Sequence, residues 1–208
     1  MKHKWITFSC AALFAVLMTG QAVAHTAQQA LDTVKQSVSV VLSDLKVHKA
    51  EYKRNPAALN RMIDSKVLPY FDVDAMARLV LGKHWRGATE TQRKTFLHEF
   101  KDLVLRTYSS ELLDYANARV EYGKPSKVKN RKRTKIGASI INSDGKRYNL
   151  VLSMAYRNGK WKGYDVSMDG LSIVTSYRSS LGEEVSRKGI QTVIDEIKDL
   201  NAKGAIKK

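Results

Sequence analysis

The run TKIGASIINSDGKRYNLVLSMAYRNGKW, residues 134–161, carries the clearest structural signal in this chain of 208 residues. Apolar and polar residues alternate on both sides of Asp144-Gly145, a dipeptide typical of two-residue hairpin turns. The second alternating run ends at Asn158-Gly159, which is another hairpin signal. The stretch therefore predicts three consecutive antiparallel strands. With Val120 and Tyr122 as a fourth, we expect a small, curved, four-stranded antiparallel sheet with one apolar face.

Helix signals flank these strands on both sides. Apolar residues recur at helical spacing over residues 31–45 upstream and over residues 173–200 downstream. Between the first helix and the strands, four places carry residues typical of helix ends: Asn55-Pro56, Asp72 or Asp74, Gly82, and Thr89 with Gln92. We therefore expect an α+β fold in which the helices pack on one face of the sheet.

The longest predicted helix begins after Thr89 and carries a stripe of large apolar residues. The stripe consists of Phe96, Phe100, Leu103, Val104, Tyr108, Leu112 and Tyr115. Such a stripe requires an extensive apolar partner surface.

The N-terminus has the three-part layout of a secretory signal peptide. A cationic start at residues 1–4 precedes an apolar run at residues 6–18 and the small-residue pattern Ala22-Val23-Ala24. We expect cleavage after residue 24, leaving residues 25–208 as one exported domain in the periplasm. Cys10 is the only cysteine and lies in this segment, so the domain has no disulfide, thiol nucleophile or cysteine-ligated metal.

The net charge of +16 predicts attraction to an anionic partner, either nucleic acid, a membrane surface or an acidic ligand. The basic run at residues 124–135 contains no aromatic residue to stack on bases, which favours a solvated strand face. Catalytic signals are weak: Gly170-Leu171-Ser172 lacks the closing glycine of a nucleophile elbow, and no two histidines have the spacing of a helical metal site. We expect no enzymatic activity, no cofactor and no metal.

Several segments, taken in order, resemble the MlaC family, also called the toluene-tolerance family. They are Asn55-Pro56, Leu68-Pro69-Tyr70-Phe71-Asp72, Met76-Ala77-Arg78, Trp85-Arg86-Gly87-Ala88-Thr89, Tyr164-Asp165-Val166, Asp169-Gly170-Leu171-Ser172 and Tyr177-Arg178. The resemblance spans roughly residues 30–200. It implies a fold similar to nuclear transport factor 2 and a periplasmic phospholipid carrier that maintains outer-membrane lipid asymmetry. The implied partners are phospholipid as cargo, an outer-membrane lipoprotein–porin complex and an inner-membrane ABC transporter with a lipid-transfer subunit. A monomer that does not bind nucleic acid is expected.

A diacyl lipid that crosses water must bury its tails, and each buried methylene contributes about 0.8 kcal/mol. We therefore expect an apolar cavity between the long helix that begins after Thr89 and the apolar face of the sheet. The candidate lipid-binding residues are Leu68, Phe71, Leu79, Val80, Trp85, Phe96, Phe100, Val104, Tyr108, Ile140, Leu150, Leu152, Met154, Val166 and Met168.

Two other functions are compatible with the sequence. An exported enzyme can use the same type of pocket on such a fold, and an exported nucleic-acid-binding module would explain the positive charge. Phospholipid released by organic extraction of the purified protein would favour the carrier.

Overall fold

The computed structural model describes residues 26–126 and 132–206 of the protein. The predicted signal peptide and residues 127–131 of the basic run lie outside the described residues. Within the described ranges the chain is α+β, as the sequence predicts.

The strands form an antiparallel meander in which each strand pairs with the next along the chain, in the order β1-β2-β3-β4-β5. Their bounds are β1 Arg119–Tyr122, β2 Arg133–Ile141, β3 Arg147–Arg157, β4 Lys160–Met168 and β5 Leu171–Ser172. Both predicted hairpins are present. At Asn158-Gly159 both residues adopt positive φ, of 49° and 80°, as a tight turn between twisted strands requires.

The prediction of four strands is wrong by one, because β5 was missed. Asp169 and Gly170 also have positive φ, of 48° and 87°, and reverse the chain so that Leu171 pairs with Met168. A strand of two residues is too short to show alternation, so only the turn dipeptide Asp169-Gly170 could have indicated it.

Most helices start and stop where the sequence signals them. The bounds are α1 Ala27–Arg54, α2 Pro56–Lys66, η1 Leu68–Tyr70, α3 Val73–Leu81, α4 His84–Gly87, α5 Glu90–Tyr108, η2 Ser110–Tyr115, α6 Ile173–Lys188 and α7 Ile190–Ile206. Asn55 Oδ1 accepts from the backbone N–H of Ala58 at 3.1 Å, and Thr89 and Gln92 form the predicted capping box. The long helix differs from the prediction, since α5 ends at Tyr108 and the chain continues as the 3₁₀ helix η2.

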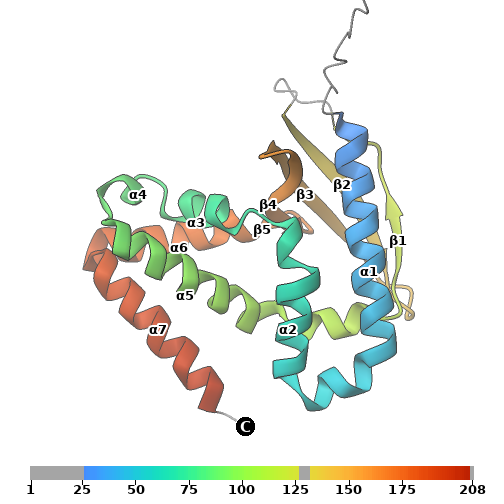
Figure 1. The fold of residues 1–208 in the computed structure, drawn as a ribbon, viewed down its shortest axis with the longest axis horizontal. Coiled ribbons are helices and arrows are strands. Elements are labelled where there is room, and N and C mark those ends of the chain that lie inside the picture. The colour runs from blue at the N-terminus through green and yellow to red at the C-terminus, as the bar shows by residue number, and fades with distance from the viewer. Residues whose placement is uncertain (1–25, 127–131, 207–208) are drawn as a thin grey trace, which may run out of the picture.

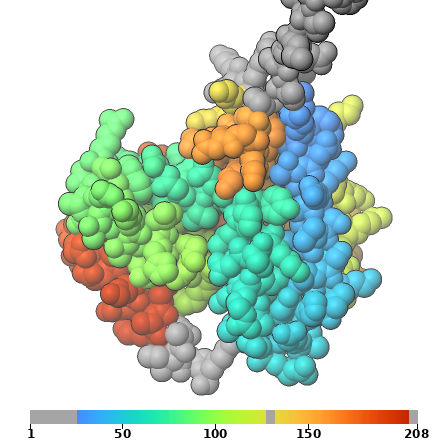
Figure 2. Space-filling model, in the orientation of Figure 1, coloured from blue at the N-terminus to red at the C-terminus, as the bar shows by residue number. Residues whose placement is uncertain are grey.

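The helices and the sheet separate the molecule into two halves (Figure 1). Helices α1 and α2 lie side by side on the half that holds the sheet, and α3, α4, α5 and α7 form the other half, as the surface view also shows (Figure 2). In the helical half, the stripe of α5 packs against α3, α6 and α7. This helical core contains Met76, Ala77, Val80, Leu81, Phe96, Phe100, Leu103, Val174, Val185, Val193, Ile194 and Ile197.

Two further apolar clusters hold α1. The sheet core joins α1 to the sheet through Ala30, Leu31, Val34, Ile136, Leu152, Met154 and Trp161. The α1–α2 core contains Leu45, Tyr52, Ala58, Leu59, Met62, Ile63, Leu113 and Ala116. Among the described residues, no helix is long and apolar enough to cross a bilayer.

Candidate functional site

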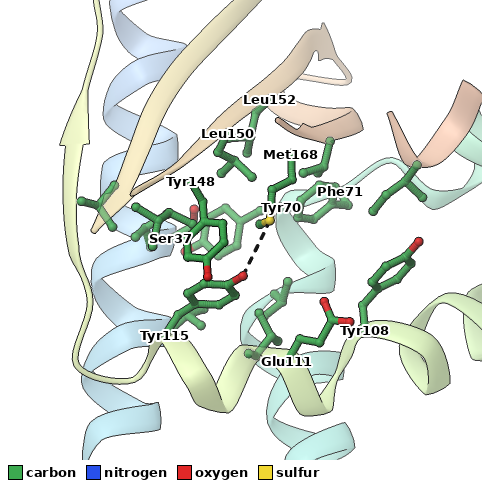
Figure 3. Close-up of a pocket in the computed structure, with 18 of the residues that line it drawn as sticks. Ser37, Tyr70, Phe71, Tyr108, Glu111, Tyr115, Tyr148, Leu150, Leu152 and Met168 are labelled. Carbon is green, nitrogen blue, oxygen red and sulfur yellow. Dashed lines mark hydrogen bonds between the residues drawn. The ribbon is translucent and has the colours of Figure 1, made fainter. Parts of the chain in front are cut away.

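A cavity of about 610 Å³ lies between α1, η1, η2 and the concave face of the sheet (Figure 3). Its side chains come from almost every element of the sheet half and from the first turn of α6. They are Ser37, Val38, Val41, Leu42, Leu45, Val67, Tyr70, Phe71, Tyr108, Glu111, Leu112, Tyr115, Val120, Ile140, Tyr148, Leu150, Leu152, Val166, Met168, Asp169, Leu171, Ser172, Ile173 and Ser176. We call it the main cavity.

The sheet wall of the main cavity follows from strand pairing. Residues two apart in a strand point to the same face, so Tyr148, Leu150 and Leu152 of β3 all point inward. The register places Ile140 opposite Tyr148 and Met168 opposite Leu150. Partners on adjacent strands thus form continuous apolar rows, which make a wall several strands wide.

The helical wall opposite the sheet comes mainly from α1. Ser37, Val38, Val41, Leu42 and Leu45 recur at the spacing of one helix face and all line the main cavity. The preceding turns of the same helix, at Ala30, Leu31 and Val34, are buried directly on the sheet instead. Helix α1 therefore closes on the sheet at its N-terminal end and leaves a cavity beside its middle turns.

The 3₁₀ helix η2 contributes Leu112 and Tyr115, which lie three residues apart and so share a face in this geometry. The Tyr115 ring meets the Tyr148 ring edge-on, with centroids 5.8 Å apart, and its hydroxyl donates to Sδ of Met168 at 3.6 Å (Figure 3). Burial, with neighbouring Tyr148 and Glu111, raises the pKa of Tyr115. The phenol therefore stays neutral at physiological pH.

Charge is sparse in this lining although the chain is strongly basic. Of the described residues that line the main cavity, none is Lys, Arg or His, and the two acids, Glu111 and Asp169, are exposed at its edge. Asp169 is already engaged in its turn, since its Oδ1 accepts from the backbone N–H of Asn149 at 2.8 Å. The cavity is thus suited to a large apolar guest and offers no cation to a buried anion.

A second cavity of about 140 Å³ adjoins the main one on the side of the helical half. Residues that line only this smaller cavity include Leu68, Met76, Phe100 and Val104. Phe71 borders both cavities.

The structure places the predicted site residues in four environments. Those that line the main cavity are Phe71, Tyr108, Ile140, Leu150, Leu152, Val166 and Met168. Those found only in the smaller cavity are Leu68, Phe100 and Val104. Those packed into or against closed cores, away from both cavities, are Val80, Trp85, Phe96 and Met154. Leu79 lies on the surface, with 36% of its area exposed.

The expected position of the cavity, between the long helix and the sheet, is correct only for the C-terminal end of the predicted stripe, where Tyr108, Leu112 and Tyr115 line the main cavity. Helix α5 reaches the main cavity only through Tyr108, its last residue. The stripe residues Phe96, Phe100 and Leu103 are instead buried in the helical core, to which α7 contributes Val193, Ile194 and Ile197. The sequence predicts that α1 and α5 are both amphipathic, but it does not show which of the two packs against the sheet.

The list of candidate lipid-binding residues missed the residues of α1 and Tyr148, and it omitted Leu112 and Tyr115 although both belong to the predicted stripe. Helical spacing at Val38, Val41 and Leu42 predicts an apolar face, and alternation does the same for Tyr148. Neither pattern distinguishes a face that is buried by protein from one that borders a cavity.

Outside the cavity, a buried carboxylate joins α1 to α2. Asp44 is 9% exposed, accepts a hydrogen bond from the Tyr52 hydroxyl and forms an ion pair with Lys66. Burial alone would raise the pKa of Asp44, but these hydrogen bonds and the nearby positive charge lower it below its ordinary value. Burial and the neighbouring carboxylate raise the pKa of Tyr52 to about 12. We call this group the Asp44 network; its role is to fix α1 to α2.

No group of three or more His, Cys, Asp or Glu side chains within residues 26–126 and 132–206 has an arrangement suited to a metal ion. His84 Nε2 and Ser186 Oγ lie 3.1 Å apart on the surface, and neither residue lines the main cavity. The site is therefore best described by its shape and apolarity.

Comparison with known proteins agrees with this description. The family model described as the MlaC protein matches residues 35–199. The chain belongs to the MlaC family. A relative from Haemophilus influenzae, the intermembrane phospholipid transport system binding protein MlaC, is 25% identical over 198 residues, which cover 93% of this chain and 91% of the relative. Toluene tolerance protein Ttg2D of Pseudomonas putida is 28% identical over 164 residues, which cover 78% and 76%.

A solved structure supports the same fold. The phospholipid-binding protein from Ralstonia solanacearum, determined in complex with a phospholipid, aligns with a TM-score of 0.79 and 24% identity over 85% of this chain and 99% of that chain. The MlaC-like fold, related to nuclear transport factor 2, is the one that the family resemblance implies. The MlaC family is non-enzymatic, which confirms the expectation that this protein is not an enzyme.

Proposed function

We propose that this protein is a phospholipid carrier that holds acyl chains in the main cavity. The proposal rests on the cavity of about 610 Å³, which has an apolar lining with no cationic side chain among the described residues. A lipid tail matches such a lining, whereas a nucleotide or a polar metabolite would leave its hydrogen-bonding groups unpaired.

The energetics of the cavity support an apolar occupant. The cavity opens to solvent at its edge, where Glu111 and Asp169 are exposed, so without a guest its apolar side chains contact water. A guest with about a dozen buried methylenes gains on the order of 10 kcal/mol by leaving water. The tails then supply most of the binding free energy, and the head group stays near the edge of the cavity.

The printed functions of the relatives support the same cargo. The Haemophilus influenzae relative is named for intermembrane phospholipid transport, and the Ralstonia solanacearum protein was solved with a phospholipid bound. By extension we propose that residues 1–24 direct export and that residues 25–208 act as a monomeric carrier in the periplasm. Its proposed partners are an outer-membrane lipoprotein–porin complex and an inner-membrane ABC transporter complex, and its role is to maintain outer-membrane lipid asymmetry.

Organic extraction of the purified protein followed by mass spectrometry tests the cargo. We expect about one phospholipid or more per chain in the extract of the unaltered protein. Leu150→Asp places a carboxylate in the cavity wall, and we expect it to remove most of the lipid.

Val151→Asp is the matched control, because it introduces the same charge at the neighbouring, half-buried position on the opposite face of β3. It should retain lipid. A folded, unaltered protein that yields no phospholipid after contact with membranes would refute the carrier proposal. If that protein instead bound DNA with a steep salt dependence, the nucleic-acid module would be favoured.

A further inference from the structure

Phe71 lies at the junction of two cavities and two apolar clusters. It borders both the main cavity and the smaller cavity, and it packs against both the helical core and the sheet core. The side chains shared by the two cavities are Val67, Phe71, Tyr108, Leu112, Val166 and Ile173. The two cavities are therefore neighbours that a single layer of side chains separates.

The Phe71 ring is held in place by the backbone of β4. Phe71 pairs with Gly163 in a parallel bridge, and the N–H of Asp72 donates to the carbonyl oxygen of Gly163 at 2.8 Å. A Cβ at position 163 would lie 2.9 Å from Cε1 and 3.0 Å from Cδ1 of the ring. Glycine at this position thus lets the ring lie directly on the strand, and a fixed ring is a wall rather than a mobile side chain.

The smaller cavity could hold chain carbons if the wall were open. Ile63, Met76, Phe100 and Val104 line it, and Lys101 and Ser109 are the polar residues in its lining. Its lining therefore continues the apolar character of the main cavity on the far side of the Phe71 ring.

From this arrangement we infer that Phe71 divides the apolar space and sets the length of acyl chain that the protein accepts. The inference rests on the proposed function, because it assumes that lipid tails occupy the main cavity. With the ring in place, a tail ends at Phe71. Without the ring, the two cavities join, and a longer tail extends into the smaller one.

The experiment is a competition for lipids that differ only in chain length. Delipidated protein is incubated with vesicles of dimyristoyl, dipalmitoyl and distearoyl phosphatidylethanolamine in equal parts, re-purified, and analysed by mass spectrometry. In Phe71→Ala we expect the ratio of distearoyl to dimyristoyl lipid to rise about fourfold or more, the factor for one additional buried methylene.

A second substitution tests whether the smaller cavity receives the added length. Val104 lines only that cavity, and Val104→Phe takes up part of its volume. Alone, Val104→Phe should leave the lipid ratio unchanged, because the tail does not reach that cavity. Combined with Phe71→Ala, it should return the ratio toward that of the unaltered protein. Phe71→Leu, which keeps an apolar side chain at the wall and protects folding, should shift the ratio in the same direction but less.

The outcomes separate the inference from the proposed function. An unaltered protein that takes up no lipid overturns both. Normal uptake with the same lipid ratio in Phe71→Ala and Phe71→Leu overturns the inference alone. A lower ratio in Val104→Phe by itself also overturns it, because the smaller cavity would then already hold a tail with the Phe71 ring in place.

Discussion

The two ends of the α1–sheet contact have similar apolar residues, but one end is a closed core and the other borders a cavity. At one end Leu31, Val34 and Met154 are buried in a closed core. At the other end Val38, Val41 and Leu150 line the main cavity. The same helix and the same strand β3 form both regions, so apolar content does not decide between core and cavity.

The difference lies in what supports the helix. At the closed end, fully buried Ala30 has a side chain small enough for α1 to approach the sheet. At the open end, Leu45 packs against α2 in the α1–α2 core, and the Asp44 network fixes the same turn of α1 to α2. Because α2 holds α1 from its outer side, α1 does not need to pack onto the sheet at this end. The cavity therefore remains open.

The largest effect should come from truncation at the closed end. Met154→Ala removes a side chain that is 1% exposed, and we expect a loss of about 2–5 kcal/mol in the free energy of unfolding. Leu150→Ala, at the open end of the same strand, should cost only about 1 kcal/mol because the residue is half-buried. Urea denaturation of the delipidated proteins measures both. Equal losses would mean that the cavity is collapsed in solution.

Lipid should stabilise the open end specifically. At a free lipid concentration of 100 times Kd, the unaltered protein should gain about 2.7 kcal/mol relative to its delipidated form. Met154→Ala should gain the same amount, since the Met154 side chain does not line the main cavity. Thermal unfolding with and without lipid checks this, and a lipid that raised Tm in neither protein would contradict it.

Removal of the Asp44 carboxylate should cost less free energy of unfolding than truncation of Met154. Asp44→Asn weakens the link to Lys66, whose side chain is 41% exposed and becomes solvated, so we expect a loss of about 1–3 kcal/mol at pH 7. Because the folded pKa of Asp44 is lowered, the stabilisation is present above its ordinary value of 3.8 and disappears as pH falls through the folded value. The variant and the unaltered protein should therefore converge in strongly acidic urea titrations.

Ionisation of Tyr52 should lower the stability of the protein at alkaline pH, as protonation of Asp44 does at acidic pH. The pKa of Tyr52 is raised from 10.0 to about 12, so its contribution is present below pH 10 and is lost as pH rises to about 12. Tyr52→Phe should reduce this loss of stability at alkaline pH, and Tyr115, whose pKa is also raised, should account for part of the remainder. An unchanged loss in the variant would assign it to tyrosines other than Tyr52.

A larger side chain at the open end should have the smallest effect on the free energy of unfolding. It should stabilise the protein at the open end and destabilise it at the closed end. Val41→Phe places a larger apolar group in the main cavity, and we expect delipidated protein to gain up to about 1 kcal/mol while its lipid occupancy falls. Ala30→Val in the closed end should instead lose about 1–3 kcal/mol by overpacking. A destabilised Val41→Phe with normal lipid content would show that the cavity lies elsewhere.

Local patterns in the sequence were sufficient for most of the fold. Capping at Asn55 and Thr89, and the turn at Asn158-Gly159, depend on residues close together in the chain, and all three were predicted correctly. The site required information of another kind. Whether Phe96 of α5 or Val41 of α1 borders the cavity depends on which helix α7 covers, and no local signal reports that pairing.

The link between α1 and α2 has a consequence for how the chain folds. The strands that face α1 follow it by about a hundred residues, so its contacts with the sheet require the closure of a long loop of chain. Helix α2 follows at once, and Leu45, Leu59 and the Asp44–Lys66 pair all lie within residues 44–66. We expect this helical hairpin to form early and to shelter part of the nascent face. Asp44→Asn should then slow refolding, whereas Met154→Ala should mainly speed unfolding, which stopped-flow kinetics distinguishes.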